Sequence, residues 1–421
     1  MLSDNHSRVA PRFFPSGLPT FRSAGESADS APAPASYWLL LAFLVLLYAN
    51  LPFVLPAADA LRPAAVVGGL ALLMIFAEVL MGRRVLTFAW PEGALLVAFV
   101  GAAALSCLTA LWPRQAAESL SDLVKMGLVF FFIANCADTE RRLRGVMWTI
   151  VICGLIPAAG TLRNYLDGHL AEGRASWLGI FANPNEVAYS LVILLPIAAF
   201  LAIRTGFAGR LLLLGTGGVF VAAIFVTFSR GGLIGLGAVV VLYAWRRRSL
   251  WLQIVLVLLV VAGLSFGEKY WSRDENFSSL NGDVSFRQRL ATSEAGLRMF
   301  ADHPLTGVGL GCSLIAWPLY APHDLYSRSA LVTHNTVIQP LGETGILGFV
   351  PFALLIGFGI WHARKIALNR SREGMSQLGA GLEIAVWGFV VCGLSGGYVL
   401  TWFPYILLGM VAAARQIPGE V

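Results

Sequence analysis

Three arginines and one histidine lie in the connections between the apolar segments of the chain: Arg174, Arg230, Arg289 and His334. A guanidinium group has a planar fork of donors that matches the oxygens of a phosphate or diphosphate. Histidine takes up a proton near neutral pH, so beside such an anion it can deprotonate a hydroxyl. Each residue also has a plainer explanation. An arginine at a membrane surface can extend toward lipid phosphates, and a lone histidine there can be structural.

Four polar residues accompany these cations and are candidates to support them. Asn185 lies in the Asn183-Pro184-Asn185 segment that follows Arg174, and Ser229 directly precedes Arg230. Asn335 directly follows His334, and Glu343 is close enough in sequence to His334 to orient a substrate.

Residues 285–301 have the apolar spacing of an amphipathic helix. Phe286, Leu290, Leu297 and Phe300 fall on one face at about 100° per residue. Either Asp283 or Ser285 could cap its first turn. Arg289 lies beside the predicted apolar face, while Arg287 and Arg298 point further toward water. Arg289 is therefore the arginine of this helix that we expect to reach a buried site.

The elements that position these residues are predicted from composition. The chain has 421 residues, of which 57% are hydrophobic and 13% charged, and its mean hydropathy is +0.72. A soluble protein carries about 25% charged residues, which are needed to cover its surface. These values predict an all-α polytopic membrane protein.

Twelve apolar segments are long enough, or nearly so, to cross a bilayer. They cover residues 37–56, 64–82, 93–112, 119–136, 146–163, 186–203, 211–228, 231–245, 250–267, 340–361, 378–396 and 398–414. The predicted organisation is a disordered tail at 1–36, transmembrane helices 1–9 at 37–267, a large loop at 268–334 that contains the amphipathic helix, and helices 10–12 with a short tail at 335–421. The first apolar segment begins too far into the chain for an ordinary signal peptide.

The distribution of basic residues predicts the orientation. The connections after the second, fourth, sixth, eighth and tenth predicted spans each contain at least two Arg or Lys residues. Loops rich in these residues stay on the cytoplasmic side, so both termini should be cytoplasmic. Residues 268–334 and the candidate site then face the opposite side of the membrane.

Several other functions are excluded or disfavoured. The net charge of +6 is not concentrated in a soluble basic domain, so no nucleic-acid partner is expected. The five cysteines (Cys107, Cys136, Cys153, Cys312 and Cys392) show no paired spacing, which disfavours disulfides and a zinc site. Phosphate-loop, HExxH, CxxC and GxSxG motifs are absent from the sequence. No cofactor and no metal are expected.

Two sets of glycines allow two interpretations each. The run Gly307-Val308-Gly309-Leu310-Gly311 could be a tight turn, or its amides could bind an anion. The spacings from Gly231 to Gly235 and from Gly393 to Gly397 could allow close helix packing, or could mark merely small positions.

With these residues in place, the chain resembles the O-antigen ligase and Wzy-type polymerase superfamily. The ligase branch has a motif of His, then Asn, Ser or Gln, nine residues, Gly, two residues and Gly, Thr or Tyr. His334, Asn335, Gly345 and Gly348 match it in full. The Arg-x-x-x-Leu motif of that branch is met by Arg174 and Leu178. The resemblance covers residues 170–355, about half of the chain.

The resemblance implies a GT-C-like glycosyltransferase in the bacterial inner membrane, with its active site facing the periplasm. The donor would be a glycan on undecaprenyl diphosphate, and the acceptor a sugar hydroxyl of the lipid A core or of another glycan. Arg174, Arg230 and Arg289 would bind the diphosphate, and His334 would act as the base of a metal-independent, inverting transfer.

Two alternatives stay open at this point. A Wzy-type polymerase would join lipid-linked repeat units with the same donor chemistry and a different acceptor. A secondary transporter or lipid-carrier flippase would place functional charges near the bilayer midplane and show related halves, which the sequence lacks.

Overall fold

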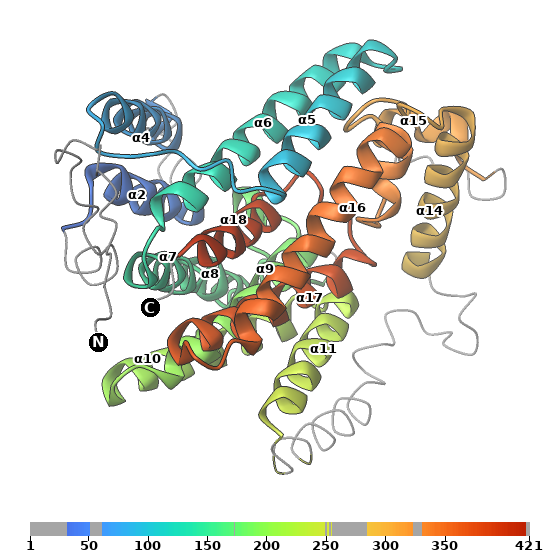
Figure 1. Cartoon of the computed structure of the whole chain (residues 1–421). Coiled ribbons are helices and arrows are strands. Elements are labelled where there is room, and N and C mark those ends of the chain that lie inside the picture. Colours follow the sequence, from blue (N-terminus) through green and yellow to red (C-terminus); the bar gives the residue numbers. More distant parts are fainter. Residues whose placement is uncertain are drawn as a thin grey trace, which may run out of the picture.

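The computed structural model describes residues 32–50, 61–171, 173–248, 284–322 and 331–417, together with Trp251 and Ile254. Within these residues the regular structure is helical (Figure 1). The α-helices are α2 (Ala35–Ala49), α4 (Pro63–Leu80), α5 (Glu92–Leu108), α6 (Pro113–Cys136), α7 (Glu140–Cys153), α8 (Leu155–Leu166), α9 (Pro184–Ile203), α10 (Phe207–Val226), α11 (Arg230–Arg247), α14 (Val284–Asp302), α15 (Ser313–Tyr320), α16 (Ile338–Leu368), α17 (Glu373–Gly393) and α18 (Trp402–Gln416).

The helices support a polytopic membrane protein. In the described part of the chain, seven helices are long and apolar enough to cross a membrane. Helices also occupy the other predicted spans, except the ninth at 250–267, which lies outside the described residues apart from Trp251 and Ile254. The count of twelve spans therefore stays a prediction. The predicted tail also lies outside the described residues as far as residue 31.

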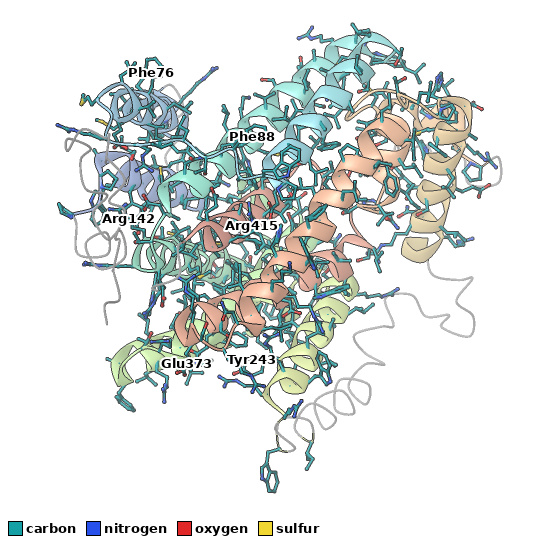
Figure 2. The ribbon with its side chains drawn as sticks, in the orientation of Figure 1. Phe76, Phe88, Arg142, Tyr243, Glu373 and Arg415 are labelled. Carbon is teal, nitrogen blue, oxygen red and sulfur yellow. The ribbon has the colours of Figure 1, made fainter. Side chains whose placement is uncertain are left out.

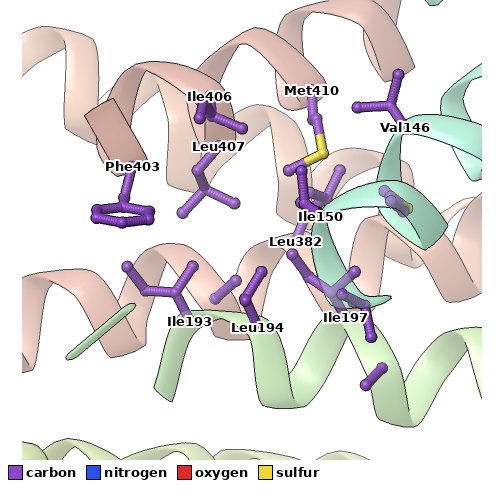
Figure 3. Close-up of a cluster of buried hydrophobic side chains, with 14 of the residues drawn as sticks. Val146, Ile150, Ile193, Leu194, Ile197, Leu382, Phe403, Ile406, Leu407 and Met410 are labelled. Atoms are coloured by element: carbon purple, nitrogen blue, oxygen red, sulfur yellow. The ribbon is translucent and has the colours of Figure 1, made fainter. Parts of the chain in front are cut away.

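Helix α9 forms the centre of the bundle. It packs against α7, α10, α11 and α17, and 78% of the residues in its most apolar 18-residue stretch are buried. Ile193, Leu194 and Ile197 of α9 contact the buried cluster that Figure 3 shows, together with side chains of α7, α17 and α18. A helix that is apolar on every face is stable in this position because it has neighbours all round. The loops at its N-terminal end are therefore held by a rigid scaffold.

Small residues let α11 approach α17 closely. A Cβ atom added to Gly231 would lie 1.9 Å from Oγ of Ser395, and one added to Gly235 would lie 2.2 Å from Sγ of Cys392. The close-packing interpretation of this pair is therefore confirmed. The same interpretation is wrong for Gly397, which lies outside any helix, against the carbonyl of Thr333.

Helix α16 is interrupted at Gly345, where φ is +61° and ψ is −163°. Residues 304–309 pair with the backbone exposed at this break. The amides of Val308 and Gly309 donate to the carbonyls of Gly342 and Glu343 at 3.0 and 2.9 Å. The amide of Ile346 donates to the carbonyl of Pro304 at 2.9 Å. This pairing attaches the segment between α14 and α15 to the bundle.

Two expectations about the elements need correction. The last span was predicted to begin at residue 398, but α18 begins at Trp402, and residues 394–401 form a loop. Helix α14 occupies the predicted range of the amphipathic helix, yet Leu290 and Leu297 are 61% and 50% exposed. The buried face consists instead of Ala291, Thr292, Ala295 and Met299, and the small side chains of the first three let α14 lie close to its neighbours. Asp283, and the side chains of Ser285 and Phe286, lie outside the described part.

Candidate active site

Arg174 lies in the loop between α8 and α9, where it is held in one orientation. Its backbone forms a two-way bridge with Ala171, with both N···O distances 3.0 Å. Its Nε donates to the carbonyl of Thr227 at 2.9 Å, and Nη2 donates to Oδ1 of Asn185 at 2.6 Å. The guanidinium group of Arg174 is thus oriented by hydrogen bonds to two neighbouring elements.

Asn185 and Ser229 join this arginine to α11. Oδ1 of Asn185 also accepts from Oγ of Ser229 at 2.8 Å. Oγ of Ser229 accepts from the amide of Gly232 at 3.2 Å, as an N-cap residue does, and so sets where α11 begins. Arg230 is the first residue of that helix and is half-buried. Arg174, Asn185 and Ser229, three of the predicted residues, therefore form one hydrogen-bonded network. A fourth, Arg230, directly follows Ser229 in the chain.

The segment around His334 is anchored to the loop 394–401. The amide of Thr336 donates to the carbonyl of Gly393 at 2.7 Å, and its Oγ1 donates to the carbonyl of Gly396 at 2.6 Å. The amide of Tyr398 donates to Oγ1 of Thr336 at 3.0 Å. Asn335 lies three residues before α16, and its Oδ1 accepts from the amides of Val337 and Ile338 at 2.8 and 3.2 Å. His334 is half-buried beside this anchor.

Tyr398, in the loop 394–401, connects the two halves of the site. Its ring stacks on Tyr189 of α9, with centroids 3.7 Å apart and planes inclined by 22°. Burial raises the pKa of Tyr398, Cys392 and Glu186 act in the same direction, and the positive charges of Arg289 and Arg174 oppose them. The charges of both arginines, one from the loop before α9 and one from α14, therefore reach the same hydroxyl.

The electrostatic environment keeps His334 neutral. Burial lowers the pKa of His334, and the charge of Arg289 lowers it further. Burial also lowers the pKa of Arg289. Among the described residues, Arg289 forms no salt bridge with a carboxylate. A neutral imidazole beside a partly desolvated cation can accept a proton while the cation attracts an anion.

Of the arginines on α14, Arg289 is the one turned toward the bundle. It is half-buried, whereas Arg287 is exposed and Arg298 forms an ion pair with Glu294 at 2.6 Å. The sequence indicated Arg289 because it lies beside a predicted apolar face. That reason is partly wrong, since Leu290 and Leu297 of that face are exposed.

The glycine run at 307–311 is a turn, and its amides are not available to an anion. Besides the pairing with α16, the amide of Leu310 donates to Oγ of Ser106 at 3.2 Å. The amide of Gly311 donates to Oε2 of Glu343 at 2.9 Å. Glu343 is 1% exposed, and its Oε2 also accepts a hydrogen bond from Nε2 of Gln339 at 3.4 Å. The structure therefore places Glu343 at the turn, where it stabilises the approach to α16.

The sequence did not single out Tyr398, Tyr189 or Thr336. The Ser395-Gly396-Gly397 stretch was a usable signal, because two adjacent glycines between apolar segments are typical of a loop. The described residues contain no group of three or more His, Cys, Asp or Glu side chains that could hold a metal ion.

One known family matches part of the chain. Residues 215–353 match the family model described as O-antigen ligase. This match supports a place for the chain in the O-antigen ligase and Wzy-type polymerase superfamily. It includes Arg230, Arg289, His334 and Asn335, whereas Arg174 and Tyr398 lie outside it. Among curated proteins, none matches the chain.

Proposed function

We propose that this protein is an O-antigen ligase-type glycosyltransferase of the bacterial inner membrane. It transfers a glycan from undecaprenyl diphosphate to a sugar hydroxyl of the lipid A core, on the periplasmic face. One observation carries the proposal: the charge of Arg289 acts on both His334 and Tyr398, and that of Arg174 acts on Tyr398, in a chain whose residues 215–353 match the O-antigen ligase model.

In the proposed reaction, neutral His334 accepts the proton of the acceptor hydroxyl. The hydroxyl oxygen attacks the anomeric carbon from the face opposite the diphosphate, so the new glycosidic bond has inverted configuration. The bond between that carbon and the diphosphate oxygen breaks, and undecaprenyl diphosphate leaves. The proton held by His334 then passes to solvent, which restores the base.

The arginines stabilise the leaving group. A departing diphosphate gains negative charge in the transition state, and cations fixed beforehand lower the energy of that state without having to reorganise. Arg174 is oriented for this by Asn185 and Thr227, and Ser229 holds Asn185. Arg230 and Arg289 supply further positive charge, while Asn335 positions the backbone beside His334. The chemistry requires no metal in this scheme.

Complementation of a deletion strain tests the proposal. Lipopolysaccharide from cells with wild type, His334→Ala or the exposed control Arg114→Ala is compared on a gel. We expect bare core and accumulated lipid-linked polymer with His334→Ala, and the full ladder with the control. Core that carries a single repeat would indicate the Wzy-type polymerase instead. A full ladder with normally expressed His334→Ala would refute the role of His334.

The transporter alternative has less support. Two buried carboxylates, Glu78 near the end of α4 and Glu383 midway along α17, are neutralised by local partners. Glu78 is paired with Arg84 at 2.8 Å, and Glu383 with Arg246 at 2.5 Å. Such pairs account for these charges without a proton pathway.

A further inference from the structure

Two adjoining cavities separate α4 from α6 at the end of the bundle away from His334. The start of α6 lies near the turn at 307–311, because the amide of Leu111 donates to the carbonyl of Val308 at 3.0 Å. The cavities lie at the other end of α6, around Asn135. They are therefore distinct from the candidate active site. In Figure 1, α2 and α4 stand to the left of α5 and α6.

The first cavity is basic. Its volume is about 600 Å³, and its polar lining consists mainly of Glu78, Arg83, Arg84, Asn135, Asp138 and Arg142. Three arginines against two carboxylates leave a surplus of one positive charge. Figure 2 shows Arg142 beside α2, near this cavity.

Internal partners occupy both carboxylates. Glu78 accepts from Nε of Arg84 at 2.8 Å and from Oγ of Ser36 at 2.8 Å. Asp138 accepts from Nη1 of Arg142 at 2.6 Å. Arg83 is exposed and forms no salt bridge within the described part of the chain. The surplus charge is therefore on Arg83, at the edge of the cavity.

The second cavity is apolar. Its volume is about 300 Å³, and its lining includes Leu72 and Ile75 of α4, Phe88, and Leu128 and Phe131 of α6. Phe88 stacks on Phe131, with centroids 5.7 Å apart, and forms one wall. Helix α4 packs against α2, but 11% of its 18 residues are buried, so most of its surface is open to another molecule.

Thr87 and Asn135 line both cavities and join them. Oδ1 of Asn135 accepts from the amide of Thr87 at 2.7 Å, and its Nδ2 donates to the carbonyl of Thr87 at 3.1 Å. These bonds fix the segment between α4 and α5 against α6. The basic cavity and the apolar cavity thus keep a fixed relation to each other.

We propose that these cavities bind one anionic phospholipid. Its phosphate would lie at Arg83 in the basic cavity, and an acyl chain would lie between α4 and α6 in the apolar cavity. The order of the two environments along α4, apolar within the span and basic at its end, matches the order of groups in such a lipid. The proposal is independent of the glycosyl transfer described above.

Native mass spectrometry of the full-length protein after delipidation tests this, with dioleoyl phosphatidylglycerol as the probe. We expect the wild type to retain it in preference to dioleoyl phosphatidylcholine. Arg83→Gln should weaken binding about tenfold, the typical effect of losing a charge-assisted hydrogen bond. Leu72→Trp should also reduce retention, because Leu72 is 41% exposed and a larger ring there fills the apolar cavity without disturbing the core.

Two further arms distinguish a lipid site from general attraction to positive charge and from a site for phosphate alone. Arg114→Gln is the control, since Arg114 is 91% exposed and pairs with Glu118 far from these cavities. Inorganic phosphate replaces the lipid in the second arm. The proposal is overturned if the wild type retains no lipid, if both lipids bind equally, if Arg114→Gln weakens binding as much as Arg83→Gln, or if inorganic phosphate binds as well as the lipid.

Discussion

At the residue scale, the proposed reaction depends on His334 being neutral when the acceptor arrives. Burial and the charge of Arg289 both lower its pKa from the ordinary value of 6.5. A base is inactive once protonated, so the pH at which kcat/KM falls to half of its plateau value should lie below 6.5.

Arg289→Gln tests the origin of this shift. Removing the positive charge takes away the smaller of the two causes, so the pKa of His334 should rise and the decline should begin at higher pH. The measurement is kcat/KM between about pH 5 and pH 8. If the decline begins at the same pH in both proteins, although Arg289→Gln is slower, the charge of Arg289 does not act on the base.

Arg174→Lys tests the orientation of the diphosphate clamp. Arg174 reaches Thr227 and Asn185 through two different nitrogens, which one ammonium group cannot reproduce. We expect transfer to fall by roughly 10- to 100-fold, as the loss of hydrogen bonds to a charged group predicts. The control is Arg163→Lys, whose side chain is 76% exposed and pairs with Asp167. Equal activity of the two variants would favour contact of Arg174 with lipid phosphates instead.

At the scale of elements, the break in α16 positions His334 relative to α14. Gly345 has a backbone conformation that other residues avoid, and a Cβ atom there would lie 2.4 Å from the carbonyl carbon of Leu305. Gly345→Ala should destabilise the protein by about 1–3 kcal/mol from backbone strain, with a further cost from the clash. The measurement is the thermal unfolding of the purified protein in detergent.

Gly357→Ala is the matched control on the same helix. A Cβ atom at Gly357 meets nothing within 4 Å, so the substitution should be neutral or stabilising by about 1 kcal/mol. Similar unfolding temperatures for the two variants would show that the break at Gly345 is not required.

Much of the element pattern was predictable because apolar length alone identifies a helix in a bilayer. What could not be predicted is how a loop sits between helices. Tyr398 looks like the start of a span by hydropathy, yet Thr336 binds its backbone and keeps residues 394–401 out of a helix. Leu290 and Leu297 look like a buried face, but the close approach of α14 selects Ala291 and Ala295 instead.

The candidate site was predictable to a similar extent. Arg174, Asn185 and Ser229 could be chosen from residue type and position, and the structure joins them by hydrogen bonds. Glu343 was chosen because it is near His334 in sequence. Its carboxylate accepts from the amide of Gly311, a contact that sequence distance does not predict, and its role toward a substrate stays a prediction.

At the scale of the whole molecule, the basic loops predict that His334 faces the periplasm. Arg114, at the start of α6, and Arg370, in the turn after α16, are exposed at positions predicted to lie on opposite sides. Cys107 is partly exposed and is first replaced by serine. In that background, Arg114→Cys should react with a membrane-impermeant maleimide in intact spheroplasts. Arg370→Cys should react after permeabilisation. The reverse pattern would invert the topology and exclude a periplasmic reaction.

The central claim is that His334 acts as the base of a transfer from a lipid diphosphate. The most direct measurement uses purified protein with undecaprenyl-diphosphate-linked glycan and a lipid A core acceptor, with single-turnover rates for wild type and His334→Ala. We predict that the variant still binds the donor but transfers about 100- to 10,000-fold more slowly, the usual contribution of a general base. A variant that transfers at the wild-type rate would contradict the account.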